Sequence, residues 1–194
     1  MASCYLPVFN MNKIIDDHYY LDGGFTNVLP ITLLERMGCN DIIGVRVKKF
    51  GLIKKKRKKE TKVTVISPKK NIGSVLLLDK DRSKENMKRG YIDTLKVLGK
   101  LEGKKFSFKR KSRYYYDFIH RNFSKMEIEK LCKKWHVKNK RELTLYCLEM
   151  FLSKAKNKDL EIYDVNRLIR KLKKEMKNFK KDEFYHYLNR IKNY

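Results

Sequence analysis

The residues best suited to chemistry are Asp22, Gly23 and Gly24, a carboxylate followed directly by two glycines. A short, mostly apolar stretch, His18 to Leu21, precedes them, so we expect Asp22 at the end of a strand. A carboxylate held there can act as a general base, bind a metal ion or form an Asx turn. The two glycines permit backbone angles that are closed to other residues. On spacing alone, the turn is the favoured interpretation.

The other candidate ligands and nucleophiles are scattered. Asp16-Asp17 and His18 lie close to Asp22, but Asp16-Asp17 fits a hairpin turn better than a metal site. Cys132 and His136 would share one face of a helix, yet two ligands do not make a site. None of the cysteines forms a C-x-x-C pair; they are Cys4, Cys39, Cys132 and Cys147. We therefore expect reduced thiols, no metal and no other cofactor.

The charge of the chain is large and unevenly distributed. Its 194 residues include 48 Lys and Arg against 22 Asp and Glu, a formal net charge of +26. Residues 1–45 carry −3, so the other 149 residues carry +29. The one run of six cations is Lys54, Lys55, Lys56, Arg57, Lys58 and Lys59. This run predicts a solvated loop first, and a contact for anionic lipid or nucleic acid second.

Composition excludes several classes of protein. A hydrophobic fraction of 42% is too high for a disordered basic tail, so the chain can bury a core. No segment approaches the roughly 18 uninterrupted apolar residues of a membrane span, and the first 22 residues do not resemble a signal peptide. We expect a cytoplasmic protein. Peripheral attachment to the inner face of the membrane is compatible with this expectation.

Apolar strands alternate with helices in the first 80 residues. Residues 13–21 predict a hairpin, and Pro30 and Gly38 mark the start and the end of a helix with Leu33, Leu34 and Met37 on its apolar face. Strands are expected over 42–47 and 63–66. This alternation predicts an α/β fold with a parallel or mixed sheet covered by helices.

From about residue 84 the hydrophobic period becomes helical. Tyr91, Leu95 and Leu98 recur at helical spacing, and Ser124 and Asn139 each precede a glutamate by three residues, the spacing of a capping box. Two further helices are expected on apolar stripes, which are Val165, Leu168, Ile169, Leu172, Met176 and Phe179, and then Phe184, Tyr187, Leu188 and Ile191. We interpret these stripes as core positions.

Four segments of the first 45 residues resemble the C-terminal motif block of patatin-like phospholipases. They are Ala2 to Phe9, Tyr19 to Pro30, Met37-Gly38 and Ile42 to Val45, in the family's order and nearly without gaps. The resemblance implies the C-terminal portion of a three-layer α/β/α sheet domain over residues 1–80. Residues 81–194 would then form a predominantly helical C-terminal region.

The resemblance also implies a lipid acyl-ester hydrolase that uses a Ser–Asp dyad. Asp22 would accept the proton of the serine hydroxyl as the serine attacks an ester carbonyl. Asp22, Gly23 and Gly24 would be the motif residues of this site, with the glycines keeping side chains away from the dyad.

The sequence departs from the family at the nucleophile. No G-x-S-x-G pentapeptide and no glycine-rich oxyanion loop occurs in the chain, and in the family both precede the block that begins here at Ala2. Neither Ser3 nor Ser74 has the surroundings of a replacement nucleophile. The chain therefore has no nucleophile of its own, and we expect it to be inactive alone.

Three hypotheses for function follow. The first is a patatin-like phospholipase fragment that contributes Asp22 when a Ser-bearing N-terminal segment is supplied. The second is a basic nucleic-acid or anionic-surface binding module without catalysis, motivated by the charge and by Tyr114-Tyr115-Tyr116 among cations. The third, compatible with the first, is attachment to an anionic membrane through Lys54 to Lys59. The sequence favours the first, with phospholipid or another acyl ester as the substrate.

Overall fold

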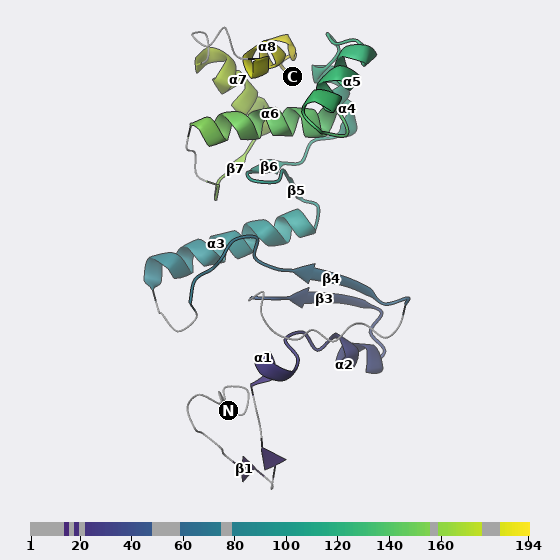
Figure 1. Cartoon of the computed structure of the whole chain (residues 1–194), viewed down its shortest axis with the longest axis vertical. Coiled ribbons are helices and arrows are strands. Elements are labelled where there is room, and N and C mark those ends of the chain that lie inside the picture. The colour runs from purple at the N-terminus through teal and green to yellow at the C-terminus, as the bar shows by residue number, and fades with distance from the viewer. Residues whose placement is uncertain are drawn as a thin grey trace. The chain divides into compact units, whose positions relative to one another are not determined.

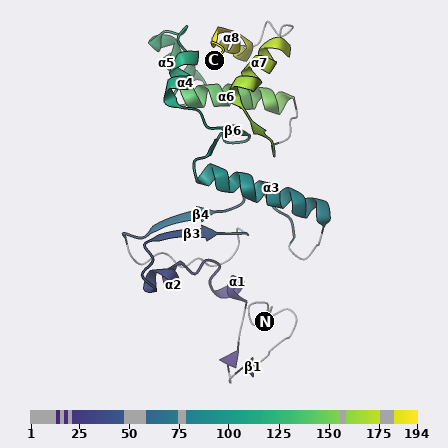
Figure 2. The ribbon, with the colours of Figure 1, turned by 180° about the vertical axis from the view of Figure 1, so that it is seen from behind.

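The computed structural model describes residues 14–15, 18–19, 22–47, 59–74, 79–155, 159–175 and 183–194. The chain divides into two compact units, residues 1–97 and residues 98–194 (Figure 1; Figure 2 shows the same ribbon from behind). Helices and small sheets occur together, as the predicted α/β class requires. Within the described residues, no helix combines the length and the apolar character that crossing a membrane would need.

The first unit begins with the predicted hairpin. Strand β1 (Ile14–Ile15) pairs antiparallel with β2 (His18–Tyr19), and Ile15 lies opposite His18. Two short helices follow, α1 (Gly23–Thr26) and α2 (Ile31–Arg36). Helix α2 begins directly after Pro30 and ends before Gly38, whose φ of 90° is the left-handed conformation that commonly ends helices. The hairpin and both ends of this helix are confirmed.

A parallel pair of strands forms the centre of the first unit. Strand β3 (Asp41–Val45) pairs with β4 (Lys62–Ile66) so that Ile43 lies opposite Thr64. Leu29, Ile31 and Ile42 form a small buried cluster on one side of the pair. Helix α3 (Lys80–Val97) packs against β4 (Figure 1). The predicted parallel pairing is therefore confirmed.

The apolar faces predicted for α2 and α3 are partly wrong. In α2, Leu33 and Met37 are exposed, whereas Ile31 and Glu35 are buried. In α3, Tyr91 is exposed and Ile92 is buried instead. Both segments are helical, as predicted. The spacing of apolar residues does not determine which face of a helix is buried, because that depends on the elements that pack against it.

One face of β3 exposes apolar side chains, and we predict that it drives self-association. Ile43 is 59% exposed and Val45 is 64% exposed, on the face opposite Ile42. Replacing both by threonine keeps β-branched side chains but removes the apolar strip. In light scattering coupled to gel filtration, the wild-type mass should rise with concentration and the double variant should stay near the monomer mass. A wild type that remains monomeric over the whole concentration series would contradict this prediction.

The second unit surrounds one central helix. A three-stranded sheet is formed by β5 (Leu101–Glu102), β6 (Ser107–Lys109) and β7 (Ile162–Tyr163), with β5 antiparallel and β7 parallel to β6. Its helices are α4 (Arg113–Ile119), α5 (Lys125–Lys134), α6 (Lys140–Lys154), α7 (Val165–Glu175) and α8 (Glu183–Arg190). Helix α6 buries residues on several of its faces, including Leu143, Leu145 and Leu148, so it occupies the middle of the core.

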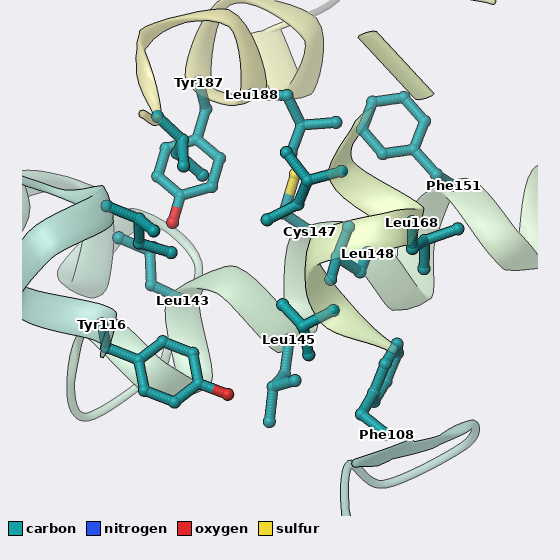
Figure 3. Close-up of a cluster of buried hydrophobic side chains, with 14 of the residues drawn as sticks. Phe108, Tyr116, Leu143, Leu145, Cys147, Leu148, Phe151, Leu168, Tyr187 and Leu188 are labelled. Carbon is teal, nitrogen blue, oxygen red and sulfur yellow. The ribbon is translucent and has the colours of Figure 1, made fainter. Parts of the chain in front are cut away.

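Side chains from every part of the second unit converge on α6. Figure 3 shows Tyr116 of α4, Phe108 of β6, Leu168 of α7 and Leu188 of α8 in one cluster with the residues of α6. The predicted stripe residues Val165, Leu168 and Ile169 of α7, and Tyr187, Leu188 and Ile191 at the C-terminal end, are all buried. Met176 and Phe179, predicted on the same stripe, lie outside the described residues.

The predicted helix caps of this unit are confirmed. The Ser124 hydroxyl accepts a hydrogen bond from the Glu127 N–H, and the Glu127 carboxylate accepts one from the Ser124 N–H at 2.8 Å. Asn139 accepts a hydrogen bond from the Glu142 N–H at 3.0 Å. These bonds satisfy backbone donors that a helix N-terminus otherwise leaves unpaired.

Candidate functional site

Asp22 lies between the hairpin and helix α1 and caps that helix. Its Oδ1 accepts a hydrogen bond from the Gly24 N–H at 2.6 Å, which is the local geometry of an Asx turn. The residue is half-buried, and Oδ2 has no hydrogen bond to any described residue. One carboxylate oxygen therefore fixes the side chain, while the other makes no hydrogen bond within the described part of the chain.

The two glycines after Asp22 have different roles. Both lie in α1 and neither has a positive φ, so the conformational freedom that glycine permits is not used here; the motif turns directly into a helix. A Cβ at Gly24 would lie 3.0 Å from Asp22 Oδ1, whereas a Cβ at Gly23 would meet nothing within 4 Å. Gly24 thus provides the space that the capping carboxylate occupies. At Gly23 a side chain would meet no neighbouring atom within 4 Å.

Asn27 is a second polar residue of the motif block, and it is not among the site residues that the sequence predicts. It ends α1, and its N–H donates to the Gly23 carbonyl at 2.8 Å. Its side-chain Oδ1 is buried and has no hydrogen-bond partner among the described residues. A buried acceptor of this kind is unfavourable unless it is paired with a donor. The signal in the sequence was only that Asn27 belongs to the motif, five residues after Asp22.

A groove of about 540 Å³ lies in the first unit, at the carboxyl ends of the parallel strands β3 and β4. Val45, Val47 and Met87 provide apolar walls, and Arg89 and Asp93 are among its polar residues. In open parallel sheets, ligands commonly bind at this edge. The groove was not predicted, because α3 supplies one of its walls from about 20 residues beyond β4.

Most of the remaining sequence candidates lie outside the described residues or on the exposed surface. Ser3, Cys4, Asp16-Asp17 and Lys54 to Lys58 lie outside the described residues, and Lys59 is exposed. His136 has a φ of 51° just after the end of α5, so the prediction that it shares a helix face with Cys132 is wrong. No group of three or more His, Cys, Asp or Glu side chains among the described residues could hold a metal ion.

The tyrosine triplet belongs mainly to the core. Tyr115 and Tyr116 are buried, and only Tyr114 is exposed. The Tyr115 hydroxyl donates to Asn166 Oδ1 at 3.1 Å, and the Tyr116 hydroxyl donates to Glu102 Oε2 at 2.9 Å. Burial raises the pKa of both tyrosines, followed in Tyr116 by the negative charge of Glu102. The triplet therefore offers one ring, rather than three, to a single-stranded nucleic acid.

Comparison of the chain with protein-family models, with curated proteins and with solved structures found no match. The function is therefore argued from the residues and their geometry.

Proposed function

We propose that this chain is the C-terminal part of a patatin-like lipid acyl-ester hydrolase, in which Asp22 is the general base of a Ser–Asp dyad. The observation that carries the proposal is the state of the Asp22 carboxylate within the matching motif block. Oδ1 is fixed by the Gly24 N–H at 2.6 Å, and Oδ2 has no partner among the described residues. A general base needs this combination of a fixed position and an open acceptor.

Two further features support the proposal. The buried Asn27 Oδ1 is a second acceptor in the motif block, available to a donor from a neighbouring segment. The groove at the carboxyl edge of β3 and β4 has apolar walls suited to an acyl chain. The serine would come from a Ser-bearing segment with a G-x-S-x-G elbow. Attachment to an anionic membrane through Lys54 to Lys59 would bring the site to its substrate.

The reaction follows from this arrangement. The serine hydroxyl donates its proton to Asp22 Oδ2 as the serine oxygen attacks the ester carbonyl carbon, and the alcohol then leaves with that proton. Water, activated by the same carboxylate, hydrolyses the acyl-serine ester and releases the fatty acid. Oδ1 stays bonded to the Gly24 N–H throughout, which keeps the carboxylate oriented.

Fragment complementation tests the proposal. The chain is mixed with, or fused behind, the Ser-bearing N-terminal half of a patatin-like phospholipase, and fatty-acid release from phosphatidylglycerol vesicles is measured. We expect release by the mixture, none by either part alone, and background release when the chain carries Asp22→Asn. The matched control is Asp41→Asn, which removes an exposed carboxylate of the same unit that pairs with Lys62 at 3.3 Å.

Two outcomes would contradict the proposal. The first is release that persists with Asp22→Asn, because the dyad then does not use this carboxylate. The second is a wild-type mixture that releases no fatty acid although both parts are folded by circular dichroism.

A further inference from the structure

Helices α4, α5 and α6 and the segments that join them line a cavity of about 810 Å³ in the second unit, which is open to solvent and far in sequence from Asp22. Helices α4 and α5 lie beside the N-terminal end of α6 (Figure 1). A volume of this size lies within the range of sites for small organic ligands, roughly 300–1,000 Å³. The cavity can therefore hold a complete small molecule rather than a single ion.

Cations dominate the polar lining of the cavity. Five of its lining residues are cationic, namely Arg113, Lys125, Lys138, Lys140 and Arg141, whereas Asp117 and Glu129 are its two acids. Lys140 pairs with Asp117 at 2.7 Å, and Arg141 lies 3.5 Å from the buried Glu102. Lys125 and Lys138 are exposed and form no ion pair with any described residue. The lining thus keeps positive charge that an anionic ligand would neutralise.

Part of the cavity lining is apolar. Ile128 is buried, and Phe123 and Cys132 are half-buried, and all three line the cavity. A phosphate group alone would leave these side chains in contact with water. A ligand that joins a phosphate to an apolar body would cover them and also meet the cations.

Contacts between the lining residues and their neighbours hold the frame of the cavity in place. The Arg190 guanidinium lies 4.3 Å from the ring centre of Phe123 and donates to Glu127 Oε1 at 2.9 Å. The hydrogen bond from Arg190, followed by those from Ser124, lowers the pKa of the Glu127 carboxyl to about 2, so Glu127 is ionised at neutral pH. Glu142 accepts a hydrogen bond from the Lys138 N–H at 3.0 Å, which fixes the segment carrying Lys138. A frame that is already ordered loses less entropy when a ligand binds.

We propose that the α4–α5–α6 cavity binds a phosphate ester joined to an apolar body. The phosphate would lie among Lys125, Lys138 and Arg113, and the apolar body would lie over Phe123, Ile128 and Cys132. A phospholipid and a nucleotide both have this chemistry, and the experiment distinguishes between them. The inference does not rest on the proposed hydrolase function, because it uses no residue of the first unit.

The test is isothermal titration of the full chain with three soluble probes: dihexanoyl phosphatidic acid below its micellar concentration, AMP and inorganic phosphate. Lys125→Glu and Lys138→Glu are expected to weaken binding of the preferred ester by about tenfold or more. The matched control is Lys130→Glu, on the same helix as Lys125, also exposed but outside the cavity. All three variants change the net charge by the same amount, so only position differs.

A second readout places the ligand in the cavity without any substitution. Cys132 lines the cavity and Cys39 is exposed in the first unit, so a bound ester should slow modification of Cys132 by N-ethylmaleimide and leave Cys39 unaffected. The rate at each cysteine is read by peptide mass spectrometry. Tighter binding of phosphatidic acid than of AMP identifies a lipid ligand, and the reverse identifies a nucleotide.

The proposal is overturned by any of four results. Lys130→Glu weakening binding as much as Lys125→Glu would show attraction by overall charge only. Binding of both esters no tighter than that of inorganic phosphate would exclude the apolar contact. No binding of any probe, or equal modification of Cys132 with and without ligand, would exclude the site itself.

Discussion

Replacing Glu149 by alanine is expected to lower the free energy of unfolding of the second unit by about 2–4 kcal/mol. The Glu149 Oε1 atom accepts hydrogen bonds from three successive backbone N–H groups, those of Lys104 at 2.7 Å, Lys105 at 2.8 Å and Phe106 at 3.2 Å. These groups form the connection between β5 and β6, and Glu149 lies on the central helix α6. One carboxylate thus attaches the sheet to the core helix.

The magnitude follows from the kind of bond that is lost. Hydrogen bonds to a charged acceptor contribute more than those between neutral groups, and donors that stay unpaired add an unfavourable term. The loop cannot easily rearrange to find other acceptors, because Gly103 has a φ of 96° and a Cβ there would lie 2.7 Å from the Phe106 carbonyl oxygen. Water can reach the exposed N–H groups of Lys104 and Lys105, which keeps the loss below the sum of three buried bonds.

Urea denaturation followed by tryptophan fluorescence measures this loss. Trp135 is the only tryptophan of the chain and is buried in the second unit, so its signal reports on that unit. Glu149→Gln, which keeps an acceptor oxygen without the charge, should lie between wild type and Glu149→Ala. Glu175→Ala removes an equal charge from an exposed pair with Lys171 and should change stability by less than about 0.5 kcal/mol. Equal effects of Glu149→Ala and Glu175→Ala would contradict the prediction.

The local signals in the sequence predicted local structure well. Pro30 and Gly38 delimit α2, and Ser124 and Asn139 cap α5 and α6, as expected. These predictions are correct because each helix end is determined within one turn, by backbone groups that need a hydrogen-bond partner. The hairpin around Asp16-Asp17 is short-range in the same sense, since its strands are two residues apart.

Features that depend on distant residues could not be predicted. Glu149 contacts a loop more than 40 residues earlier, and the five cations of the cavity come from positions between Arg113 and Arg141, on three helices and on the connection between α5 and α6. Leu33 and Met37 had the spacing of a buried face, yet the structure leaves both exposed. In each case the sequence supplies suitable side chains, but only the packing of separate elements decides which of them meet.

For the candidate hydrolase site, the sequence predicted the residue Asp22 but not the hydrogen bonding of its carboxylate. Asp22 was identified from its motif, and its Oδ1 is held by the Gly24 N–H while Oδ2 has no hydrogen bond to the residues that the structure describes. The helical conformation of Gly23 and Gly24 was missed, because two adjacent glycines are weak helix formers and are more typical of turns. The capping bond from Asp22 offsets this weakness at the first turn.

The second unit is also expected to lose stability as the pH falls from 7 to 5, through His120. Its ring is buried; Nδ1 lies 2.7 Å from the Tyr116 carbonyl oxygen and Nε2 lies 2.7 Å from the Tyr187 hydroxyl. A carbonyl oxygen can only accept, so Nδ1 carries the proton and Nε2 accepts from the Tyr187 O–H. A second proton at Nε2 would remove the acceptor of that bond, so the Tyr187 hydroxyl would have to turn and accept from the ring instead. The Tyr187 hydroxyl is itself 3.1 Å from Thr144 Oγ1, so the network joins α8 and α6 to the end of α4.

Burial lowers the pKa of His120 to about 4, although its hydrogen bond to the Tyr116 carbonyl acts in the opposite direction. In the unfolded chain the pKa of histidine is about 6.5. Between these two values the unfolded state binds a proton that the folded state excludes, so the free energy of unfolding falls as the pH falls. Integrated from pH 7 to pH 5, the loss is about 2 kcal/mol. Above pH 7 the contribution of His120 is constant.

This pH window separates His120 from the acidic groups of the unit. The pKa values of Glu127, Asp117 and Asp164 are all lowered in the folded state, so their contributions are lost only at more acidic pH. Urea denaturation from pH 7 to pH 5, followed through Trp135, should therefore show the slope in wild type and in His186→Gln, which alters an exposed histidine of α8. His120→Gln should be less stable at pH 7 and should lack the slope. The same slope in His120→Gln as in wild type would assign the pH dependence to other groups, because no imidazole then remains at that buried position to exclude the proton.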